Sequence, residues 1–338
     1  MKYARGPGNL EVREVPEPEV GTGQVKIAVK AAGICGTDLH MYKDEYPTRP
    51  PVILGHECAG TIVEVGPDVD GLRVGDAVTA LPTIIVCGEC RYCLEGQLSL
   101  CERRLSFGSG VHGAFTNYLV VPAWAVRTLP PNVDCYSGAL SEPLSCCVKA
   151  VSMLTRVMAG DIVIVTGPGP IGLLTAQLAK AEGAYVILTG TSIDTERLAL
   201  GGRWVDQTVN VEQDDITPLV KDLTDGDGAD IVFECSGAAA ATRSAIDLLR
   251  KEGTLTQIGL HGKPFELDFF KAELKELTIR TSFAGSIQSW DRVMTLLRQR
   301  KIDLAPLISD VLPITEWKTA FDRLERKEGV KILLEPVE

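Results

Sequence analysis

Residues 161–172 read DIVIVTGPGPIG, and their pattern predicts the fold of the second half of the chain. Asp161–Thr166 is a short run rich in β-branched residues that predicts a buried strand, and the apolar segment at 170–182 predicts a helix. A G-x-G-x-x-G pattern lies between them, where glycines allow a tight turn, close approach of a pyrophosphate and packing of the helix on the sheet. An ordinary strand-to-helix turn would share the pattern. The predicted dinucleotide contacts in this turn are Gly167, Gly169, Pro170, Ile171 and Gly172.

Apolar strand candidates and helix-like segments alternate on both sides of this turn. The further expected strands are Ala184–Thr189, Ala229–Glu234, Gly253–Ile258 and Leu277–Phe283. The expected helices lie near 170–182, 213–223 and 240–251. Because buried apolar strands that alternate with helices form βαβ units, the pattern predicts a doubly wound parallel sheet.

The residue at the end of the second expected strand bears on the choice of cofactor. NAD-selective folds usually place Asp or Glu about 20 residues after the glycines, whereas this chain has Gly190 there. The absence of a carboxylate, with hydroxyls and Arg197 nearby, favours NADP over NAD. The alternative is that Asp194 or Glu196 takes the acidic role and Arg197 is solvated. The further candidate cofactor contacts are Gly190, Thr191, Ser192, Arg197, Ser236 and Ile258.

The first half of the chain is rich in short strands. The expected strands are Val25–Lys30, Gly60–Val65 and Gly75–Ala80, each bounded by Gly, Pro or Asp. A helix is expected over Leu144–Met158. Towards the C-terminus, 289–300 and 315–327 have the periodicity of amphipathic helices, and Val330–Glu335 is a possible closing strand.

Four of the ten cysteines lie close together, at Cys87, Cys90, Cys93 and Cys101. Four thiolates with this spacing can close a tetrahedron around one zinc ion, and because sulfur fills every position, such a site is structural. Free thiols and an iron–sulfur cluster are the alternatives. Disulfides explain the cysteines less well, because the N-terminus lacks the apolar core of a signal peptide.

A second possible metal site is spread along the chain. Cys35 lies in GICGTDLH, and His56 and Glu57 lie in GHEC. A Cys, a His and a carboxylate can hold zinc with an open position, as a catalytic metal requires. Glu142 is another candidate carboxylate. By itself, a lone Cys is more often a small buried residue and a lone His more often makes a local hydrogen bond.

Composition excludes several classes of protein. The chain has 338 residues, of which 45% are hydrophobic and 23% charged, and its net charge is −11. The length predicts two domains. An acidic chain lacks the positive surface that nucleic acids require, and no basic run or long apolar stretch indicates a membrane. We therefore expect a cytoplasmic protein with neither partner.

Taken together, these motifs resemble the zinc-dependent medium-chain dehydrogenases, which include alcohol, polyol (sorbitol-like) and threonine dehydrogenases. The resemblance covers essentially the whole chain, with the motifs in family order. It implies a GroES-like, β-rich catalytic domain at 1–150 and 290–338, with a zinc lobe near 85–103, and a Rossmann domain at 151–289. It also implies a homodimer or homotetramer formed through the Rossmann domain.

The resemblance also implies roles for the candidate residues. Cys35, His56 and Glu57 match the catalytic zinc ligands, and Glu142 matches a polyol-branch glutamate that holds the zinc-bound water or exchanges with it. The four clustered cysteines match the structural zinc site. Thr37 and His40 match a proton relay that passes through the cofactor ribose.

The expected reaction is hydride transfer between a secondary alcohol, polyol or sugar-like, and a nicotinamide cofactor, with NADP favoured and NAD possible. Ala284-Gly285 stands where the sorbitol branch has Arg-Tyr, which argues against sorbitol itself as the substrate. Glu142-Pro143 stands where the threonine branch usually has Asp-Pro, which argues against threonine. L-threonine 3-dehydrogenase and a sugar dehydrogenase remain alternatives. A non-catalytic zinc- and nucleotide-binding protein is the rival from another class, and a zinc-free quinone reductase would lack the four-cysteine lobe.

Overall fold

The computed structural model describes residues 1–337, which form two compact units. The first contains Met1–Glu142, Gly285–Arg300 and the chain from Leu304 onward. The second contains Pro143–Ala284 and Lys301–Asp303. Helix α4 (Ser141–Val148) begins in the first unit and ends in the second, shortly before the division expected after residue 150.

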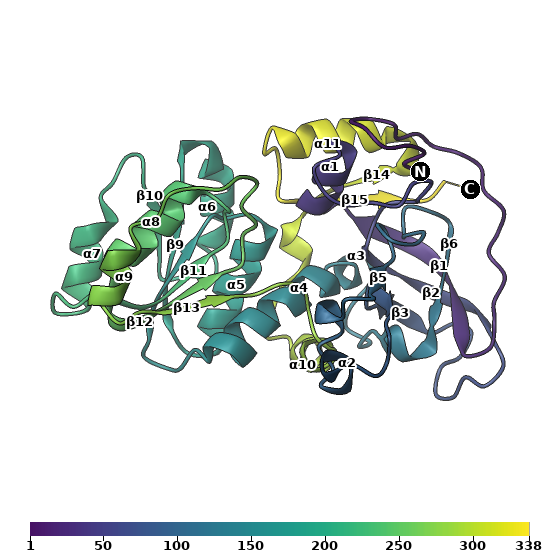
Figure 1. The fold of residues 1–338 in the computed structure, drawn as a ribbon, viewed down its shortest axis with the longest axis horizontal. Helices are drawn as coiled ribbons and strands as arrows, with labels where there is room; N and C mark the ends of the chain where they lie inside the picture. The colour runs from purple at the N-terminus through teal and green to yellow at the C-terminus, as the bar shows by residue number, and fades with distance from the viewer. Residues whose placement is uncertain (338) are drawn as a thin grey trace. The chain divides into compact units, whose positions relative to one another are not determined.

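The first unit is built around a seven-stranded, mainly antiparallel sheet (Figure 1). Its long strands β1 and β2 are neighbours and bury one apolar cluster around Val25, Ile27 and Ile62. The sheet strands are β1 (Gln24–Gly33), β2 (Glu57–Val65), β3 (Ala77–Ala80), β6 (Tyr118–Pro122), β7 (Val126–Thr128), β14 (Ile308–Pro313) and β15 (Lys331–Glu335). A separate two-stranded sheet pairs β4 (Thr83–Ile85) with β5 (Leu105–Ser106).

Short helices surround this sheet. The α-helices are α1 (Gly36–Tyr42), α2 (Arg91–Leu94), α3 (Cys135–Gly138), α10 (Ile287–Arg298) and α11 (Trp317–Glu325). The 3-10 helices are η1 (Leu98–Leu100), η2 (Ala123–Ala125), η5 (Ala305–Leu307) and η6 (Ile314–Glu316). Helix α11 packs Ala320 and Phe321 against β15, which closes the C-terminal part of the core.

The second unit is a six-stranded parallel sheet in the order β10-β9-β8-β11-β12-β13 (Figure 1). The chain extends from β8 to β10 on one side and then from β11 to β13 on the other, which is the doubly wound topology. The strands are β8 (Ile162–Thr166), β9 (Tyr185–Gly190), β10 (Gln207–Asn210), β11 (Ala229–Glu234), β12 (Leu249–Gln257) and β13 (Thr278–Thr281).

The helices of the second unit follow its strands. They are α5 (Pro170–Ala181), α6 (Thr195–Gly201), α7 (Ile216–Leu223), α8 (Ala239–Leu248) and α9 (Phe269–Leu274), with a 3-10 turn η4 (Ser192–Asp194). The predicted helix 144–158 is instead α4 continued by a π-helix, η3 (Lys149–Thr155), which ends at the left-handed Arg156. The expected β-rich domain and doubly wound parallel sheet are thus confirmed. No helix within residues 1–337 is long and apolar enough to span a bilayer.

Candidate active site

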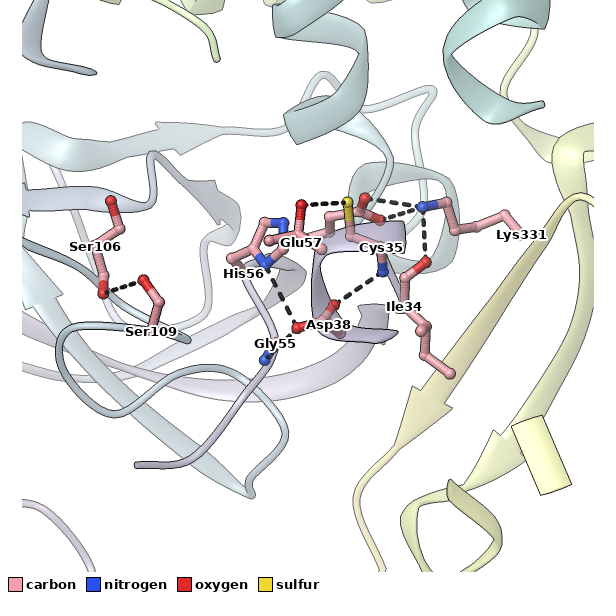
Figure 2. Close-up of polar contacts among 10 residues, drawn as sticks. Ile34, Cys35, Asp38, Gly55, His56, Glu57, Ser106, Ser109 and Lys331 are labelled. Atoms are coloured by element: carbon pink, nitrogen blue, oxygen red, sulfur yellow. Dashed lines mark hydrogen bonds and ion pairs between the residues drawn. The ribbon is translucent and has the colours of Figure 1, made fainter. Parts of the chain in front are cut away.

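A single buried carboxylate fixes the two segments that carry Cys35 and His56. Cys35 lies between β1 and α1, and its backbone N–H donates to Asp38 Oδ2 at 2.9 Å. The other oxygen, Oδ1, accepts from Gly55 N–H at 3.2 Å and lies 3.6 Å from His56 Nδ1 (Figure 2). Asp38 is fully buried. A carboxylate beside one ring nitrogen orients a ligating histidine and leaves the other nitrogen for a metal.

Cys35, His56 and Glu57 form a cluster whose candidate ligand atoms all lie within 4.8 Å of one another. Thiolate, imidazole and carboxylate are the donors that catalytic zinc sites use. A Cβ built on Gly33 would lie 2.2 Å from Glu57 Oε2, so the carboxylate occupies space that only a glycine leaves open. The three residues therefore fit a zinc ion with an open position.

Lys331 on β15 holds the carboxylate of this cluster. Its Nζ donates to both oxygens of Glu57, at 2.8 and 2.7 Å, and to the carbonyl of Ile34 at 3.0 Å (Figure 2). Burial lowers the pKa of Lys331, but the negative charges of Glu57 and Cys35 raise it by more than burial lowers it. The net pKa of Lys331 therefore lies above the ordinary value. Lys331 therefore stays cationic and offsets negative charge where thiolate and carboxylate meet.

His56 responds to the same charges. Burial lowers its pKa, whereas Asp38 and Cys35 raise it, and the net pKa lies well above the usual value. Since zinc binds neutral imidazole, metal binding at this cluster would release a proton from His56.

Thr37 and His40 both lie on α1, which begins immediately after Cys35. The Thr37 hydroxyl lies 3.6 Å from Cys35 Sγ. His40 is partly exposed, and its Nδ1 contacts Glu45 Oε2 at 2.7 Å. Because the carboxylate accepts a hydrogen bond, the neutral ring carries its proton on Nδ1 and Nε2 is left as a proton acceptor.

Glu142 lies outside the three-residue cluster. It is in the first turn of α4 and is mostly buried, and its charge contributes to raising the pKa values of Cys58 and Lys331. The structure thus brings Glu142 into the electrostatic surroundings of the cluster rather than into its set of close donors.

The four clustered cysteines converge as their spacing predicts. Their Sγ atoms lie within 4.8 Å of one another, and the Cys90–Cys93, Cys101–Cys87 and Cys87–Cys93 separations are 3.5, 3.7 and 3.8 Å. Sulfurs bound tetrahedrally at about 2.3 Å from zinc would be about 3.8 Å apart. Backbone N–H groups of Glu89 and Cys90 lower the pKa of Cys87 to about 6, which favours its thiolate. These residues fit a closed zinc site.

This lobe is attached to the first unit through the start of α10. The Ile287 N–H donates to the Gly96 carbonyl at 3.3 Å, and Gln288 Nε2 donates to the Glu95 carbonyl at 3.1 Å. Ser99 Oγ donates to the Gly285 carbonyl at 3.4 Å. A metal that closes the lobe would therefore also order the surface on which α10 rests.

The glycine-rich turn has the close packing that a dinucleotide site requires. Gly167 has a positive φ of 84°, and a Cβ there would lie 2.7 Å from the Ser236 Cβ. A Cβ on Gly172 would lie 1.9 Å from the Gly167 carbonyl oxygen. Gly169 caps α5, Pro170 follows in its first turn, and a Cβ on Gly169 would meet nothing within 4 Å. The helix N-terminus is thus open to an anion.

The residues expected to select the cofactor lie at the end of β9. Thr191 donates from N–H and Oγ1 to Asp194 Oδ2, at 3.1 and 2.8 Å. Arg197 is mostly buried and lies 3.7 Å from Asp194 Oδ1. Burial lowers the pKa of Arg197, and Asp194 opposes that shift. Arg197 is therefore paired within the protein rather than solvated. The remaining residue of this group, Ser192, donates from its N–H to Glu212 Oε2 at 2.9 Å.

Sequence reasoning did not identify three residues that shape the site. Asp38 stands three positions after Cys35 on the same short helix, a place from which it can reach back to the helix start. Lys331 is a lysine within the apolar run VKILLE, a pattern that indicates a buried partner. Gly33 precedes the cluster, and only the pairing of β1 with β2 reveals its contact with Glu57.

Comparison with known proteins identifies the family. Residues 21–131 match the alcohol dehydrogenase GroES-like domain, and residues 170–299 match the zinc-binding dehydrogenase domain. A sorbitol dehydrogenase from Halalkalibacterium halodurans is 42% identical over 340 residues, covering 100% of this chain and 99% of the relative. A D-arabitol-phosphate dehydrogenase from Enterococcus avium is 38% identical, covering 99% of this chain and 96% of the relative.

A solved structure agrees with these relatives. A zinc-binding dehydrogenase from Sinorhizobium meliloti, bound to NADP, superposes with a TM-score of 0.88 and 32% identity, covering 98% of this chain and 97% of that one. Together with the three-donor cluster, the four-cysteine lobe and the glycine-rich turn, these matches show that the chain belongs to the zinc-dependent medium-chain dehydrogenase family.

Proposed function

We propose that this protein is a zinc-dependent dehydrogenase that transfers a hydride between a secondary alcohol, polyol or sugar-like, and a nicotinamide cofactor, with NADP favoured. The observation that carries the proposal is the cluster of Cys35, His56 and Glu57, built at the ends of β1 and β2. The 42% sequence identity between this chain and a sorbitol dehydrogenase, over the whole chain, supports a polyol-like substrate.

The chain's own residues divide the work at this cluster. Zinc, when bound, supplies a Lewis acid that polarises the oxygen of the substrate. Cys35, His56 and Glu57 would hold it, Asp38 orients His56, and Lys331 limits the net negative charge. Four cysteines at a distance would hold a second, structural zinc, namely Cys87, Cys90, Cys93 and Cys101.

The proton of the substrate hydroxyl needs a route to solvent. The Thr37 hydroxyl lies beside Cys35 and can accept and pass on a proton, and His40 lies on the same helix at the surface. Glu45 fixes the tautomer of His40 that leaves Nε2 able to accept. Thr37 and His40 are therefore our candidates for the proton relay, with the cofactor ribose between them.

The preference for NADP rests on the end of β9. Gly190 places no carboxylate against a 2′-phosphate. Thr191 and Ser192, which carry hydroxyls, follow Gly190 directly in the sequence. Arg197 adds a guanidinium whose charge Asp194 partly offsets. The preference is therefore expected to be moderate, with NAD accepted as well.

The test is a panel of initial rates in zinc-replete protein. Polyols, their phosphates, sugars, simple secondary alcohols and L-threonine are each assayed with NAD and with NADP, and kcat/KM is compared. We expect the highest value for a polyol or other secondary alcohol with NADP. A highest value for L-threonine or for an anomeric sugar hydroxyl would replace the proposed substrate class with one of those alternatives.

The variant Gly190→Asp tests the cofactor argument separately. A Cβ at this position lies 3.0 Å from Pro168 and 3.2 Å from the Asp194 Cβ, so the side chain fits after a shift of a few tenths of an ångström. A carboxylate there should repel a 2′-phosphate and move the preference towards NAD. An unchanged NADP-to-NAD ratio of kcat/KM would show that Gly190 does not select the cofactor. Silence of the wild type across the whole panel would favour the non-catalytic binding protein.

A further inference from the structure

Glu234 is a buried carboxylate that the proposed chemistry does not use. It is the last residue of β11 and is 0% exposed. Its oxygens accept five hydrogen bonds, from Thr166 Oγ1 at 3.1 Å, Ser236 N–H at 2.8 Å, Gly237 N–H at 3.0 Å, and from Ser236 Oγ and Gln257 Nε2. All five donors are neutral groups. Because burial of a carboxylate is costly unless it is fully hydrogen-bonded, this arrangement requires every donor to be in place.

The donors connect the ends of three neighbouring strands. Thr166 is the last residue of β8, and Gln257 is the last residue of β12. Strands β8, β11 and β12 are adjacent in the sheet. Between β8 and β11 the order in which successive strands are added to the sheet reverses. In doubly wound sheets, ligands bind beyond the carboxyl ends of the strands at this switch point. The Glu234 carboxylate thus joins the strand ends where a dinucleotide would lie.

Glu234 also sets the two loops that follow these strands. Its backbone carbonyl accepts from the N–H groups of Ile258 and Gly259, each at 2.8 Å. A Cβ on Gly259 would lie 2.3 Å from the Gly237 nitrogen and 2.8 Å from Glu234 Oε2. Loops 235–238 and 258–261 therefore pack directly on each other and on the carboxylate. His261 adds a contact, because its Nδ1 lies 2.9 Å from the Gly237 carbonyl.

The first of these loops meets the glycine-rich turn. The Ser236 Cβ is the nearest atom to the space a Cβ on Gly167 would fill, at 2.7 Å. The residue proposed to contact the 2′ position of the adenosine, Gly190, ends β9 on the other side of β8. If the adenosine half of the cofactor extends towards β9, the nicotinamide half crosses to the side of β11 and β12.

We propose that Glu234 is a positioning residue for the nicotinamide half of the cofactor, acting through Ser236, Gly237 and the loop after β12. This inference rests on the proposed function, since it assumes a nicotinamide cofactor. It places Glu234 behind the loop rather than in contact with substrate. The expected signature is therefore a loss of affinity for the whole cofactor that spares its adenosine half.

The test compares the binding of two kinds of ligand to the same enzyme. NADPH and NADH carry the nicotinamide, whereas ADP-ribose and its 2′-phosphate lack it. The variant Glu234→Gln keeps the size of the side chain but places an amide NH₂ against donor groups. We expect the dissociation constant of NADPH to rise about tenfold or more, as for a buried hydrogen bond lost, and that of 2′-phospho-ADP-ribose to change less than about threefold. The KM for cofactor should rise in parallel, with the NADP-to-NAD ratio unchanged.

Asp230→Asn is the matched control. Asp230 lies at the other end of the same strand, and its carboxylate also reaches β8, accepting from Ile162 N–H at 2.8 Å and from Arg250 Nε at 2.6 Å. Its loss should lower stability without selective loss of cofactor affinity. A second variant, Thr166→Val, removes one donor to Glu234 at the end of β8. It should weaken the binding of NADPH selectively, but less than Glu234→Gln does. It serves as the test if Glu234→Gln does not fold.

The outcomes are distinguishable. If Glu234→Gln and Thr166→Val bind NADPH as tightly as the wild type does, the positioning role is overturned. Equal losses for NADPH and 2′-phospho-ADP-ribose, or a similar selective loss in Asp230→Asn, would also overturn it, because they would indicate a general structural effect. If the wild type binds neither NADPH nor NADH, the proposed function fails instead.

Discussion

The candidate metal cluster depends on neighbouring residues that hold the proposed ligands in place. Gly33 leaves room for the Glu57 carboxylate, and Lys331 donates to both of its oxygens. Breaking a buried ion pair by removing one partner typically costs about 3–5 kcal/mol, because the other charge is left without a partner. Position 331 therefore matters to stability as well as to the charge of the cluster.

The two groups of cysteines should respond differently to substitution. We expect about two zinc ions per chain in the wild type and about one in either Cys35→Ser or Cys93→Ser, because each removes a ligand from a different site. Cys35→Ser should lose turnover by a factor of about 10³ or more and keep its Tm, since an open site supplies the chemistry. Cys93→Ser should lower Tm, because the closed lobe would lose its metal.

Elemental analysis, thermal unfolding and initial rates check these expectations. Cys135→Ser is the control, because Cys135 is partly buried and belongs to neither cluster. It should keep two zinc ions, its Tm and its activity. Similar behaviour of Cys35→Ser and Cys93→Ser in all three measurements would show that the division between catalytic and structural sites is wrong.

Side chains join neighbouring helices and strands of the parallel sheet. Asp206, before β10, accepts from Lys180 of α5 at 2.7 Å on each oxygen and from the Val186 N–H of β9 at 2.8 Å. Burial raises the pKa of Asp206, but Lys180 and the Val186 N–H lower it more, so the net pKa lies below its usual value of 3.8. One carboxylate thus holds a helix, a strand and a loop together.

This arrangement predicts a pH-dependent stability. A carboxyl group whose pKa is depressed on folding stabilises the fold above its unfolded pKa, and that contribution disappears as the pH falls through the folded pKa. Asp206→Asn should therefore cost about 1–2 kcal/mol at pH 7. This cost should begin to fall only below about pH 4 and should disappear as the pH passes through the lower folded pKa. Asp247→Asn is the control, since its partner Lys271 is also exposed and the change should be near zero. Urea unfolding across pH measures both, and a pH-independent loss in Asp206→Asn would contradict the argument.

The parallel sheet could be predicted because its strands are buried on both faces and therefore form unbroken apolar runs. Ala229–Glu234 was placed with its observed bounds. Strand β12 begins at Leu249, inside the predicted helix 240–251, because Arg250, Lys251 and Glu252 are polar and resemble a helix end. Strands β6, β7, β10 and β14 were not predicted, since short strands at sheet edges lack a long apolar pattern.

The site was predictable to a different degree. The two candidate ligand sets were predicted because cysteine and histidine within glycine-rich segments are unusual. The structure adds that Cys35, His56 and Glu57 lie close together, and that the residues of the four-cysteine group do so as well. Asp38, Lys331 and Glu234 could not be assigned, because their importance arises from partners far away in sequence. Glu234 and Gln257, for example, are 23 positions apart and meet only after β11 pairs with β12.

One edge of the parallel sheet bears on the predicted homo-oligomer. Strand β13 ends the sheet, and all four of its residues are exposed. The neighbouring α9 exposes Phe269, Phe270 and Leu274, at 55%, 63% and 64%. An exposed strand edge with apolar neighbours is a template for pairing with another chain. If the chain forms the homo-oligomer that the family resemblance implies, we expect a second copy to pair here about a two-fold axis, which would bury the same surface on both copies.

Ile279→Lys tests this interface directly. Ile279 lies within β13 and is 38% exposed, so a lysine there is accommodated in a single chain but would place a charge on the strand edge with which a second copy would pair. We expect sedimentation or light scattering to show a halved mass relative to the wild type, with the circular dichroism of the folded chain retained. Val211→Lys is the matched control, because Val211 is 47% exposed and follows β10 at the opposite edge of the same sheet. If Val211→Lys but not Ile279→Lys dissociates the oligomer, the interface lies at the β10 edge. A wild type that is already a monomer would contradict an interface at either edge.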